Sequence, residues 1–446
     1  MKNIKSSCLV LFLGLTLLWL LADDVLTRDY EFFALRGSLV NLTGILAMGA
    51  MSFGLLLIIR WSAMESLLGG LDKNYRLHKW LGIGALVLSI AHWLWAKGPK
   101  WMVGWGWLER PVRKAGGAAA GSEPSAVVAF LRSQRGLAEE LGEWAFYAAV
   151  LLIVLALLKR FPYRWFFKTH RLLAIVYLVL VFHSVVLMKT AYWSSPLGPL
   201  MAALMLGGTV AACISLLRRV GHARRAVGVI ESLEHHEGNR VLGVGIRLQD
   251  RWPGHEAGQF AFVTFDRAEG PHPFTISSAW HDDGQLLFNI KGIGDYTRTL
   301  PQTLGIGDMV TVEGPYGRFD FGGEQNAQVW IGGGIGITPF IARMQALAQH
   351  PDGHSVDLFY CTSEPDEAFI TRLRGLAERA GVRLHVLVSA RDGRLTVERL
   401  CQEVPAWQSA SFWFCGPAGF GQALREGLVA RGLDSADFHQ ELFDMR

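Results

Sequence analysis

Long apolar segments fill the first half of this chain, and short alternating segments fill the second half. A helix of about 20 apolar residues crosses a hydrocarbon core about 30 Å thick. Six segments approach or exceed this length: residues 6–22, 38–59, 78–96, 144–158, 172–190 and 197–217. The fourth is short unless its helix begins before Trp144. The pattern predicts an all-α bundle of six membrane-spanning helices over residues 1–222.

Lysine and arginine gather in four clusters beside these segments. They are Lys2 and Lys5; Arg60, Lys73, Arg76 and Lys79; Lys159, Arg160, Arg164, Lys168 and Arg171; and Arg218, Arg219, Arg224 and Arg225. Six spans put all four clusters on one side, which the positive-inside rule makes cytoplasmic. No A-x-A-like cleavage site follows the first segment, so we expect a span there and not a signal peptide.

The second half changes its pattern twice. Five short segments with strand composition, separated by turn residues, predict a small antiparallel β-barrel over residues 223–325. They cover residues 227–232, 240–247, 259–265, 286–290 and 309–314. From residue 326 to 446, strands at 329–331, 356–361, 383–388 and 411–414 alternate with helical segments. This alternation predicts an α/β Rossmann-like domain.

Composition excludes two classes of function. The net charge of +4 is small, and the positive residues cluster beside the spans, so nucleic-acid binding is not indicated. The five cysteines are scattered without a CxxC pair, which argues against a disulfide framework. A cytosolic second half fits this cysteine usage.

Four histidines lie in or at the edge of the apolar segments: His78, His92, His170 and His183. A single histidine there is most simply a paired core residue, but titratable groups at membrane depth are costly and mark functional sites. The first two are 14 residues apart and the last two 13 apart. Each pair spans roughly 20 Å of helix, which suits two stacked haems. We predict that His78 and His170 bind an inner haem, and His92 and His183 an outer haem.

The two spacings differ in helical phase. Fourteen residues return close to the same helix face, whereas thirteen leave the side chains about 140° apart. The helix with His170 and His183 must therefore bend, contain a π-bulge or present them on two sides. Haem propionates need cations, and Arg36 is the candidate at the outer haem. Its alternative role is snorkelling to the interface.

Two motifs in residues 223–325 suit a flavin. The first contains His272, Pro273, Phe274, Thr275, Ser277 and Ser278, and the second Lys291, Gly292, Gly294 and Thr297. An aromatic ring can stack on a flavin, and hydroxyls can reach its N5 atom and ribityl chain. Glycines allow the backbone to approach a pyrophosphate closely, and Thr297 offers it a hydroxyl.

Two further motifs suit a nicotinamide nucleotide. A strand runs into Gly332, Gly333, Gly334, Gly336, Thr338 and Pro339, and a helix follows. A glycine-rich turn between strand and helix presents backbone N–H groups to phosphate. The last strand opens into Cys415, Gly416 and Pro417, where the thiol is a candidate neighbour of the nicotinamide. Phe443, near the end of the chain, is a candidate cover for the flavin.

These motifs resemble those of the transmembrane NADPH oxidase and ferric reductase family, over nearly the whole chain. The resemblance rests on Leu71-Asp72-Lys73-Asn74-Tyr75-Arg76-Leu77-His78-Lys79, on Thr169-His170-Arg171-Leu172 and on the spacings of 14 and 13. The second half resembles the ferredoxin–NADP reductase superfamily, with the oxidase-type form His272-Pro273-Phe274-Thr275. The resemblance implies that Phe274 and Thr275 face the isoalloxazine. It further implies a bacterial-type enzyme in the inner membrane, with its FAD and NAD(P) half in the cytoplasm.

The predicted function is a transmembrane oxidoreductase that passes electrons from NAD(P)H through FAD and two b-type haems to an outer acceptor. Ferric iron and dioxygen both remain open as acceptors. The alternative is a cytochrome b-type subunit that feeds quinone or a partner protein, which the attached reductase half argues against. We predict no obligatory protein partner. Glu364 favours NADH, while Arg391, Arg394 and the family resemblance favour NADPH.

Overall fold

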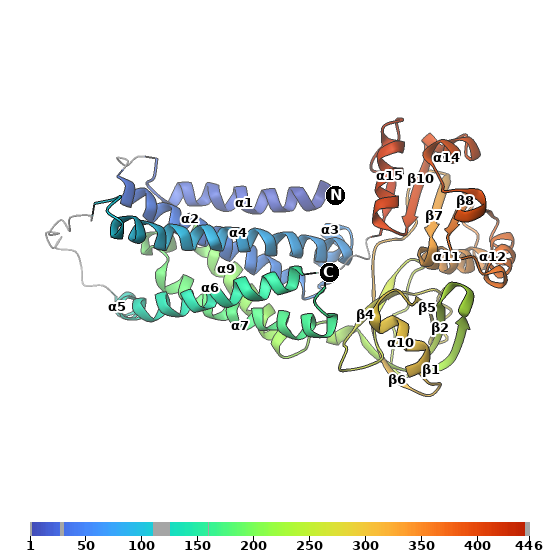
Figure 1. Ribbon diagram of the computed structural model, residues 1–446, viewed down its shortest axis with the longest axis horizontal. Helices are drawn as coiled ribbons and strands as arrows, with labels where there is room; N and C mark the ends of the chain where they lie inside the picture. Colours follow the sequence, from blue (N-terminus) through green and yellow to red (C-terminus); the bar gives the residue numbers. More distant parts are fainter. Residues whose placement is uncertain (1, 27–30, 110–124, 159, 442–446) are drawn as a thin grey trace. The chain divides into compact units, whose positions relative to one another are not determined.

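The computed structural model describes residues 2–26, 31–109, 125–158 and 160–441. The chain separates between Val220 and Gly221 into two compact units, each described here by itself. The first unit is helical, and the second contains both sheets (Figure 1).

Helices make up the described part of the first unit. They are α1 (Lys2–Ala22), α2 (Phe32–Leu57), α3 (Ser62–Leu68), α4 (Leu71–Gly104), α5 (Ala126–Ser133), α6 (Arg135–Leu157), α7 (Tyr163–Leu187), α8 (Thr190–Trp193) and α9 (Leu197–Leu216). Six of them are long and apolar enough to cross a membrane: α1, α2, α4, α6, α7 and α9. The prediction of six spans is confirmed in this sense, and the fourth does begin before Trp144, at Arg135. The short helices α3, α5 and α8 were not predicted.

The long helices bury small residues and expose large apolar ones. Ala50, Ala85, Ala211 and Ala212 are buried where helices approach each other. Large apolar side chains such as Leu21 and Leu206 are more than half exposed. This distribution suits a hydrocarbon solvent, because small residues let helix backbones pack closely while the outer surface stays apolar.

A buried carboxylate joins four helical segments at one end of the bundle. Asp23, which follows α1, accepts hydrogen bonds from Ser38 of α2 (2.8 Å) and from Tyr192 of α8. Lys189, between α7 and α8, lies 2.5 Å from Oδ2, the oxygen that Tyr192 also contacts, whereas Ser38 donates to Oδ1. A buried carboxylate is stable only when it is paired and hydrogen-bonded in this way. The network therefore ties the ends of these helices together.

The second unit begins with an antiparallel sheet of order β4-β3-β6-β1-β2-β5. Its elements are η1 (His222–Arg224), β1 (Arg225–His236), η2 (Glu237–Asn239), β2 (Val241–Leu248), β3 (Phe260–Thr264), β4 (His272–Thr275), β5 (Gln285–Lys291), α10 (Asp295–Thr303) and β6 (Met309–Tyr316). The five predicted strands are present, and β4 and α10 are additional. A single bridge between Ile276 and Phe288 connects the end of β4 to β5, so the sheet curls back on itself.

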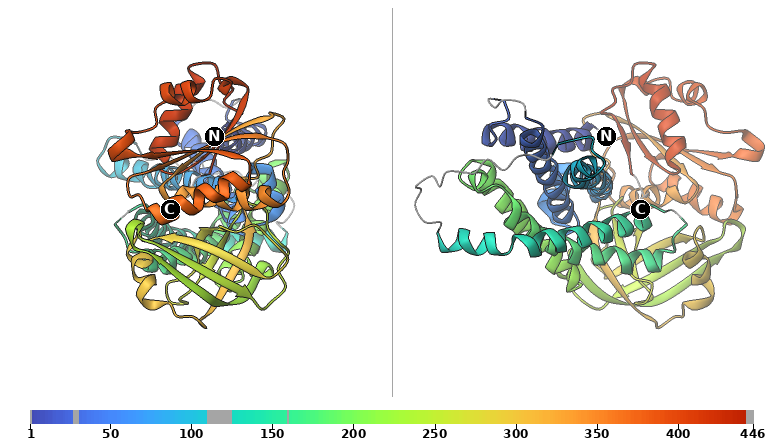
Figure 2. Two further views of the ribbon diagram at one scale, coloured as in Figure 1. Left: turned by 90° about the vertical axis from the view of Figure 1, so that its right-hand side faces the viewer. Right: turned by 60° about the vertical axis from the view of Figure 1, so that its left-hand side comes forward.

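A parallel sheet of order β11-β10-β7-β8-β9 follows. Its elements are β7 (Ala327–Gly333), η3 (Gly334–Ile337), α11 (Thr338–Gln349), β8 (Ser355–Thr362), α12 (Glu367–Arg379), β9 (Val382–Val388), α13 (Ser389–Asp392), α14 (Val397–Glu403), η4 (Trp407–Ser409), β10 (Ala410–Cys415), α15 (Ala418–Val429) and β11 (Phe438–Gln440). Helices α11 and α12 cover one face, and α14 and α15 cover the other (Figure 2). The strand order reverses beside β7, and the crevice at such a reversal is where open α/β sheets bind ligands.

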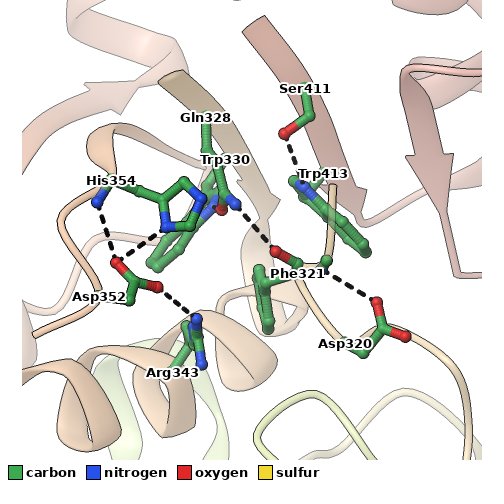
Figure 3. A network of polar contacts seen from close by, with 10 residues as sticks. Asp320, Phe321, Gln328, Trp330, Arg343, Asp352, His354, Ser411 and Trp413 are labelled. Atoms are coloured by element: carbon green, nitrogen blue, oxygen red, sulfur yellow. Dashed lines mark hydrogen bonds and ion pairs between the residues drawn. The ribbon is translucent and has the colours of Figure 1, made fainter. Parts of the chain in front are cut away.

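Aromatic side chains anchor the segment that joins the two sheets. Phe321 of this segment packs against Trp330 of β7 and Trp413 of β10 (Figure 3). The side chain of Gln328 donates to the Phe321 carbonyl (2.9 Å) and accepts from the Trp330 indole (2.8 Å). Ser411 accepts from the Trp413 indole. The indole N–H groups of Trp330 and Trp413 therefore both have a partner, as is usual for large aromatic residues in a core.

Candidate functional site

The four membrane histidines form two pairs in the first unit. The ring centres of His78 and His170 lie 5.8 Å apart, and those of His92 and His183 lie 6.1 Å apart. An imidazole nitrogen bonds a first-row metal at about 2 Å, so two imidazoles on opposite sides of one ion have ring centres about 6 Å apart. Helices α4 and α7 each contribute one histidine to each pair. Both pairs are those that the spacing predicts.

Backbone carbonyls orient three of the four rings. The Nδ1 atom of His78 lies 2.9 Å from the carbonyl oxygen of Gly54, that of His92 lies 2.9 Å from Val40, and that of His183 lies 2.8 Å from Ala138. A carbonyl oxygen only accepts, so Nδ1 must carry the proton in each ring. The lone pair is then on Nε2, the arrangement that metal-bound histidines use.

His170 is held differently. Its ring stacks on Phe166, one turn earlier in α7, with ring centres 5.1 Å apart. Its Nδ1 atom is buried and has no hydrogen-bond partner among the described residues. The amide of Asn74, one turn before His78, is also buried and unpartnered within the described ranges. The inner pair therefore has polar atoms available to a bound group, whereas the outer pair is fully oriented by backbone.

Glycines make room for the rings. A Cβ atom at Gly142 of α6 would lie 2.0 Å from the Nδ1 of His183, which no packing tolerates. A Cβ at Gly44 of α2 would lie 3.2 Å from the ring of His92, and one at Gly54 would lie 3.5 Å from His78. Gly142 and Gly44 therefore let α6 and α2 approach the rings closely, whereas the space at Gly54 would also admit a Cβ atom. Sequence reasoning missed these three positions.

The phase difference between the two spacings needs no break in α7. The helix is continuous from Tyr163 to Leu187 without a π-bulge. Of the three possibilities, a bend, a π-bulge or histidines on two sides, the described helix excludes the π-bulge. His183 reaches the carbonyl of Ala138 in α6, while His170 stacks within α7 itself. The two rings have different surroundings, as a rotation of about 140° between them requires.

Arg36 has a structural role that its sequence position did not suggest. Its guanidinium donates to the carbonyl oxygens of Trp95 (3.0 Å) and Ala96 (2.7 Å) in α4. Pro99 lies inside α4 and has no N–H to offer the carbonyl four residues earlier, which is that of Trp95. Arg36 replaces this missing donor. A propionate contact stays a prediction, for which the remaining N–H groups of the guanidinium are available.

The metal chemistry of the pairs is restricted. No group of three or more histidine, cysteine, aspartate or glutamate side chains suited to a metal ion occurs among the described residues. Two imidazoles alone leave a metal ion short of ligands, so a metal ion at either pair would need further ligands from a bound group or from water.

The first flavin motif forms the edge strand β4. Pro273 is tolerated there because an edge strand can lack one ladder hydrogen bond. The ring of His272 stacks on Tyr296 at 4.7 Å and on Phe274 at 6.3 Å, which makes a row of three rings. Burial lowers the pKa of His272 to about 4, so the ring is neutral at pH 7. A neutral aromatic row of this kind suits a flat heteroaromatic ligand.

The hydroxyls that follow β4 are partly used within the sheet. Ser277 is fully buried, and its oxygen accepts from the backbone N–H of Asn289 (3.1 Å). Ser278 accepts from the N–H of Leu287 (3.1 Å). Both serines therefore join the end of β4 to β5, and Ser277 has no exposed surface to offer a flavin. Thr275 is largely buried as well, at the last position of β4.

The second flavin motif connects β5 to α10. Gly294 caps α10, and the hydroxyl of Thr297 accepts from the N–H groups of Ile293 and Gly294, both at 3.1 Å. Gly292 donates its N–H to the carbonyl of Arg240 (3.0 Å). Lys291, at the end of β5, forms an ion pair with Glu364 at 2.8 Å. Thr297 therefore shapes the turn, while a pyrophosphate contact stays a prediction.

The two nucleotide motifs lie side by side at the carboxyl ends of β7 and β10. A Cβ at Gly336 would lie 2.2 Å from the carbonyl oxygen of Cys415, and one at Gly333 would lie 2.9 Å from Pro417. A Cβ at Gly416 would in turn lie 3.0 Å from the Cα of Gly333. Glycine is required wherever backbones pass this closely. At Gly334 the reason differs, because its φ is +58° and the space beside it is open.

Thr338 and Pro339 begin α11 and are buried. The Thr338 hydroxyl donates to the carbonyl of Ile335 (3.1 Å), so it closes the turn. Cys415 is also buried, and burial raises the pKa of its thiol well above the usual range. The thiol belongs to the core beneath α11 and is not presented to solvent. Phe443 lies outside the described residues.

A cleft opens beside the glycine turn. Its lining includes apolar and aromatic residues, and its polar side chains come from both sheets. It is lined by Asn239, Val241, Asn289, Lys291, Gly334, Ile335, Ile337, Thr338, Ile341, Tyr360, Thr362, Glu364 and Phe369. We call it the nucleotide cleft. Asn239, Asn289, Tyr360 and Phe369 were not predicted, because their meeting depends on how the two sheets pack together.

Known proteins resemble the two units separately. Residues 43–181 match the family "Ferric reductase like transmembrane component", and residues 233–320 match an "FAD-binding domain" family. The flavohemoprotein of Bordetella pertussis is 28% identical over 39% of this chain and 48% of its own length. The carnitine monooxygenase reductase subunit of Escherichia coli is 31% identical over 33% of this chain and 44% of its own. The chain spans less than two thirds of these relatives.

A flavohemoglobin from Malassezia yamatoensis is a solved structure that overlaps most of the chain. It covers 92% of this chain and 98% of its own, at 19% identity and a TM-score of 0.49. The FAD/NAD-binding domain of a nitric oxide dioxygenase from Vibrio cholerae covers 48% of this chain and 97% of its own, at 24% identity and a TM-score of 0.42.

The chain therefore combines six apolar helices, a transmembrane region matched to ferric reductases and a sheet-rich FAD/NAD-binding module. Three of the four paired histidines lie in the transmembrane match, and the row of rings on β4 lies in the FAD-binding match. In one chain, a transmembrane part that resembles ferric reductases is thus joined to a part that resembles FAD-binding domains.

Proposed function

We propose that this protein carries electrons from NAD(P)H across the membrane, through FAD and two bis-histidine b-type haems, to an acceptor on the outer face. The proposal rests on the two histidine pairs in one helical bundle, in which three Nδ1 atoms are hydrogen-bonded to backbone carbonyls. Such imidazoles are preorganised as metal ligands, and their tautomer is fixed before any metal is bound.

His78 and His170 would hold the inner haem, and His92 and His183 the outer one. When bound, FAD accepts the two electrons of a hydride and releases them singly, which the one-electron haems require. The protein supplies orientation: carbonyls fix the imidazoles, and glycines bring α2 and α6 against them. It also supplies an apolar surround, which together with axial ligation sets haem potentials.

In the second unit, an antiparallel barrel over residues 223–325 would hold FAD along β4. Phe274 and the neutral ring of His272 offer stacking surfaces, and Thr275 offers a hydroxyl at the end of the strand. A Rossmann-like domain over residues 326–446 would hold the nicotinamide nucleotide at the glycine turn and at Gly416 and Pro417. The open space beside Gly334 lets backbone N–H groups approach phosphate.

The clusters of lysine and arginine support a cytoplasmic location for the second unit, and the protein would lie in a bacterial inner membrane. Both imidazole positions on each iron would be taken, so the acceptor would react at the exposed haem edge. Ferric iron and dioxygen are the two acceptors that suit such an edge. A cytochrome b-type role toward quinone or a partner protein is the second candidate, and the reductase module in the same chain disfavours it.

Purified protein loaded with haem and FAD tests the acceptor. NAD(P)H-driven reduction of cytochrome c, with and without superoxide dismutase, would be measured beside reduction of a ferric chelate. Loss of the cytochrome c signal with the dismutase would identify dioxygen as the acceptor. A ferric signal that persists without oxygen would identify a metalloreductase. Absence of both signals, with flavin still reduced, would favour quinone or a partner protein.

A further inference from the structure

A carboxylate at the nucleotide cleft is held between two cations from the other sheet. Glu364 follows β8, and one of its oxygens lies 2.8 Å from the Nζ of Lys291, at the end of β5. Its other oxygen is paired with Arg240, which immediately precedes β2. Each carboxylate oxygen therefore has its own cation. Hydrogen bonding to Lys291 leads the effects that lower the pKa of Glu364, so it is ionised at neutral pH.

The position of Glu364 relates it to the glycine turn. Strand β8 runs parallel to β7, and Cys361 lies opposite Gly333. In sheets that bind dinucleotides, the phosphates sit at the turn after one strand, and a side chain beyond the neighbouring strand reads the ribose. A carboxylate there accepts from a ribose 2′-hydroxyl, whereas a positive group accommodates a 2′-phosphate. Glu364 occupies this position, and its carboxylate is paired with Lys291 and Arg240.

The cleft has few other charges that can compete. Among the described residues that line it, Lys291 is the one cation and Glu364 the one anion. Arg391, a sequence candidate for a 2′-phosphate, is bound to the neighbouring carboxylate of Asp392 at 3.1 Å. Another pair, Arg372 with Glu234 at 2.6 Å, joins α12 to β1 nearby and keeps the two sheets together. A substitution that removes the charge of Glu364 should therefore leave the rest of the cleft in place.

We propose that Glu364 makes the cleft select NADH over NADPH, and that it masks a latent 2′-phosphate site formed by Lys291 and Arg240. The inference rests on the proposed function, because it requires a nicotinamide nucleotide in this cleft. A 2′-phosphate meets the carboxylate as a like charge and must displace it to reach the cations. Without the carboxylate, the same cations present two donors to the phosphate.

Calorimetric titration of the full-length, FAD-loaded protein with 5′-AMP and 2′,5′-ADP tests this inference. These probes differ only by the 2′-phosphate. The native protein should bind 5′-AMP more tightly. Glu364→Gln should improve the affinity for 2′,5′-ADP relative to 5′-AMP by about tenfold or more, since a phosphate beside a carboxylate costs at least that much even in water. Glu367→Gln, an exposed carboxylate three residues on, is the matched control and should leave the ratio unchanged.

A second substitution tests the role of the cations. Lys291→Met in the Glu364→Gln background should remove most of the gain for 2′,5′-ADP, and an unchanged thermal unfolding midpoint reports that the fold is intact. An unchanged ratio of the two affinities in Glu364→Gln, or a native preference for 2′,5′-ADP, would overturn this inference but leave the proposed function standing. Failure of both probes to bind the native protein and all variants would overturn the proposed nucleotide site as well.

Discussion

The imidazoles of His92 and His183 face each other with ring centres 6.1 Å apart and ring planes 78° apart. The first ring is fixed by a carbonyl of α2 and the second by a carbonyl of α6. Four helices therefore meet at this pair, two that carry the imidazoles and two that orient them. Imidazoles fixed in this way would lose little entropy on binding a metal, so the proposed function makes direct predictions about cofactor content.

Gly142→Ala should abolish the outer haem. The added methyl would lie 2.0 Å from the Nδ1 of His183, so the ring must leave its position. Haem content, measured as the pyridine haemochrome, should fall from about two per chain to about one. Gly136→Ala in the same helix is the control, because a Cβ there meets no atom within 4 Å. Since alanine favours helices over glycine, a loss confined to Gly142→Ala cannot come from helix propensity.

His92→Leu should remove the outer haem and acceptor reduction, while NAD(P)H still reduces FAD. The flavin motifs and the nucleotide cleft lie in the second unit, and His92 lies in the first. Stopped-flow absorbance of the flavin under anaerobic conditions measures this. If flavin reduction disappears although the protein is folded and keeps FAD, the proposed order of electron carriers is wrong.

Arg36→Met should destabilise the bundle by about 1–3 kcal/mol, because the carbonyl of Trp95 then has no donor. Pro99→Ala should reduce that loss, since alanine restores the N–H that the helix lacks at this position. Thermal unfolding of the single and double variants in detergent gives the coupling between the two sites. Loss of haem with unchanged stability, and no effect of Pro99→Ala, would instead support a propionate contact.

Protonation of His272 should weaken the second unit in mild acid. Burial lowers its pKa to about 4, from about 6.5 in an unfolded chain, although the carboxylate of Glu269 lies 3.6 Å away. The unfolded state then binds the proton more strongly, so stability is complete above pH about 6.5 and falls as the pH drops towards about 4. The slope is at most about 1.4 kcal/mol per pH unit.

Urea unfolding followed by flavin fluorescence between pH 7 and 4.5 measures this loss. His272→Phe keeps a ring against Tyr296 but does not titrate, so it should flatten the profile. His281→Gln, at an exposed histidine, should not alter it. An unchanged slope in His272→Phe would assign the acid sensitivity to another group, such as His255, whose pKa burial also lowers.

The histidine pairs could be predicted from sequence because they depend on one periodicity. Two spacings of nearly four helical turns, on two apolar segments, suffice to pair His78 with His170 and His92 with His183. The role of Arg36 and the pairing of Glu364 with Lys291 and Arg240 could not be predicted in this way. Pro99 does signal an unpaired carbonyl at Trp95, but nothing local indicates that a residue 59 positions earlier will reach it.

Residues at the ends of strands were predicted only in part, for a physical reason. The glycine turn and Cys415-Gly416-Pro417 were expected near a nucleotide, and they do meet at the ends of two adjacent strands. Successive side chains of a strand point to opposite faces of the sheet, so the direction of the last one depends on its place in this alternation. Cys415 shares the face of Trp413, which packs under α11, so its thiol is buried although its backbone borders the turn. Ser277 is buried by the same mechanism, at the junction of β4 and β5.

If electrons from NAD(P)H reach metal centres held by the four paired histidines, NADH or NADPH should reduce those centres in the purified, haem- and FAD-loaded protein without oxygen. An anaerobic absorbance spectrum should then show full reduction of two six-coordinate haems per chain, and of one per chain in His92→Leu. Bleaching of the flavin while all haem stays oxidised, or a native haem content that His92→Leu does not lower, would exclude this electron path.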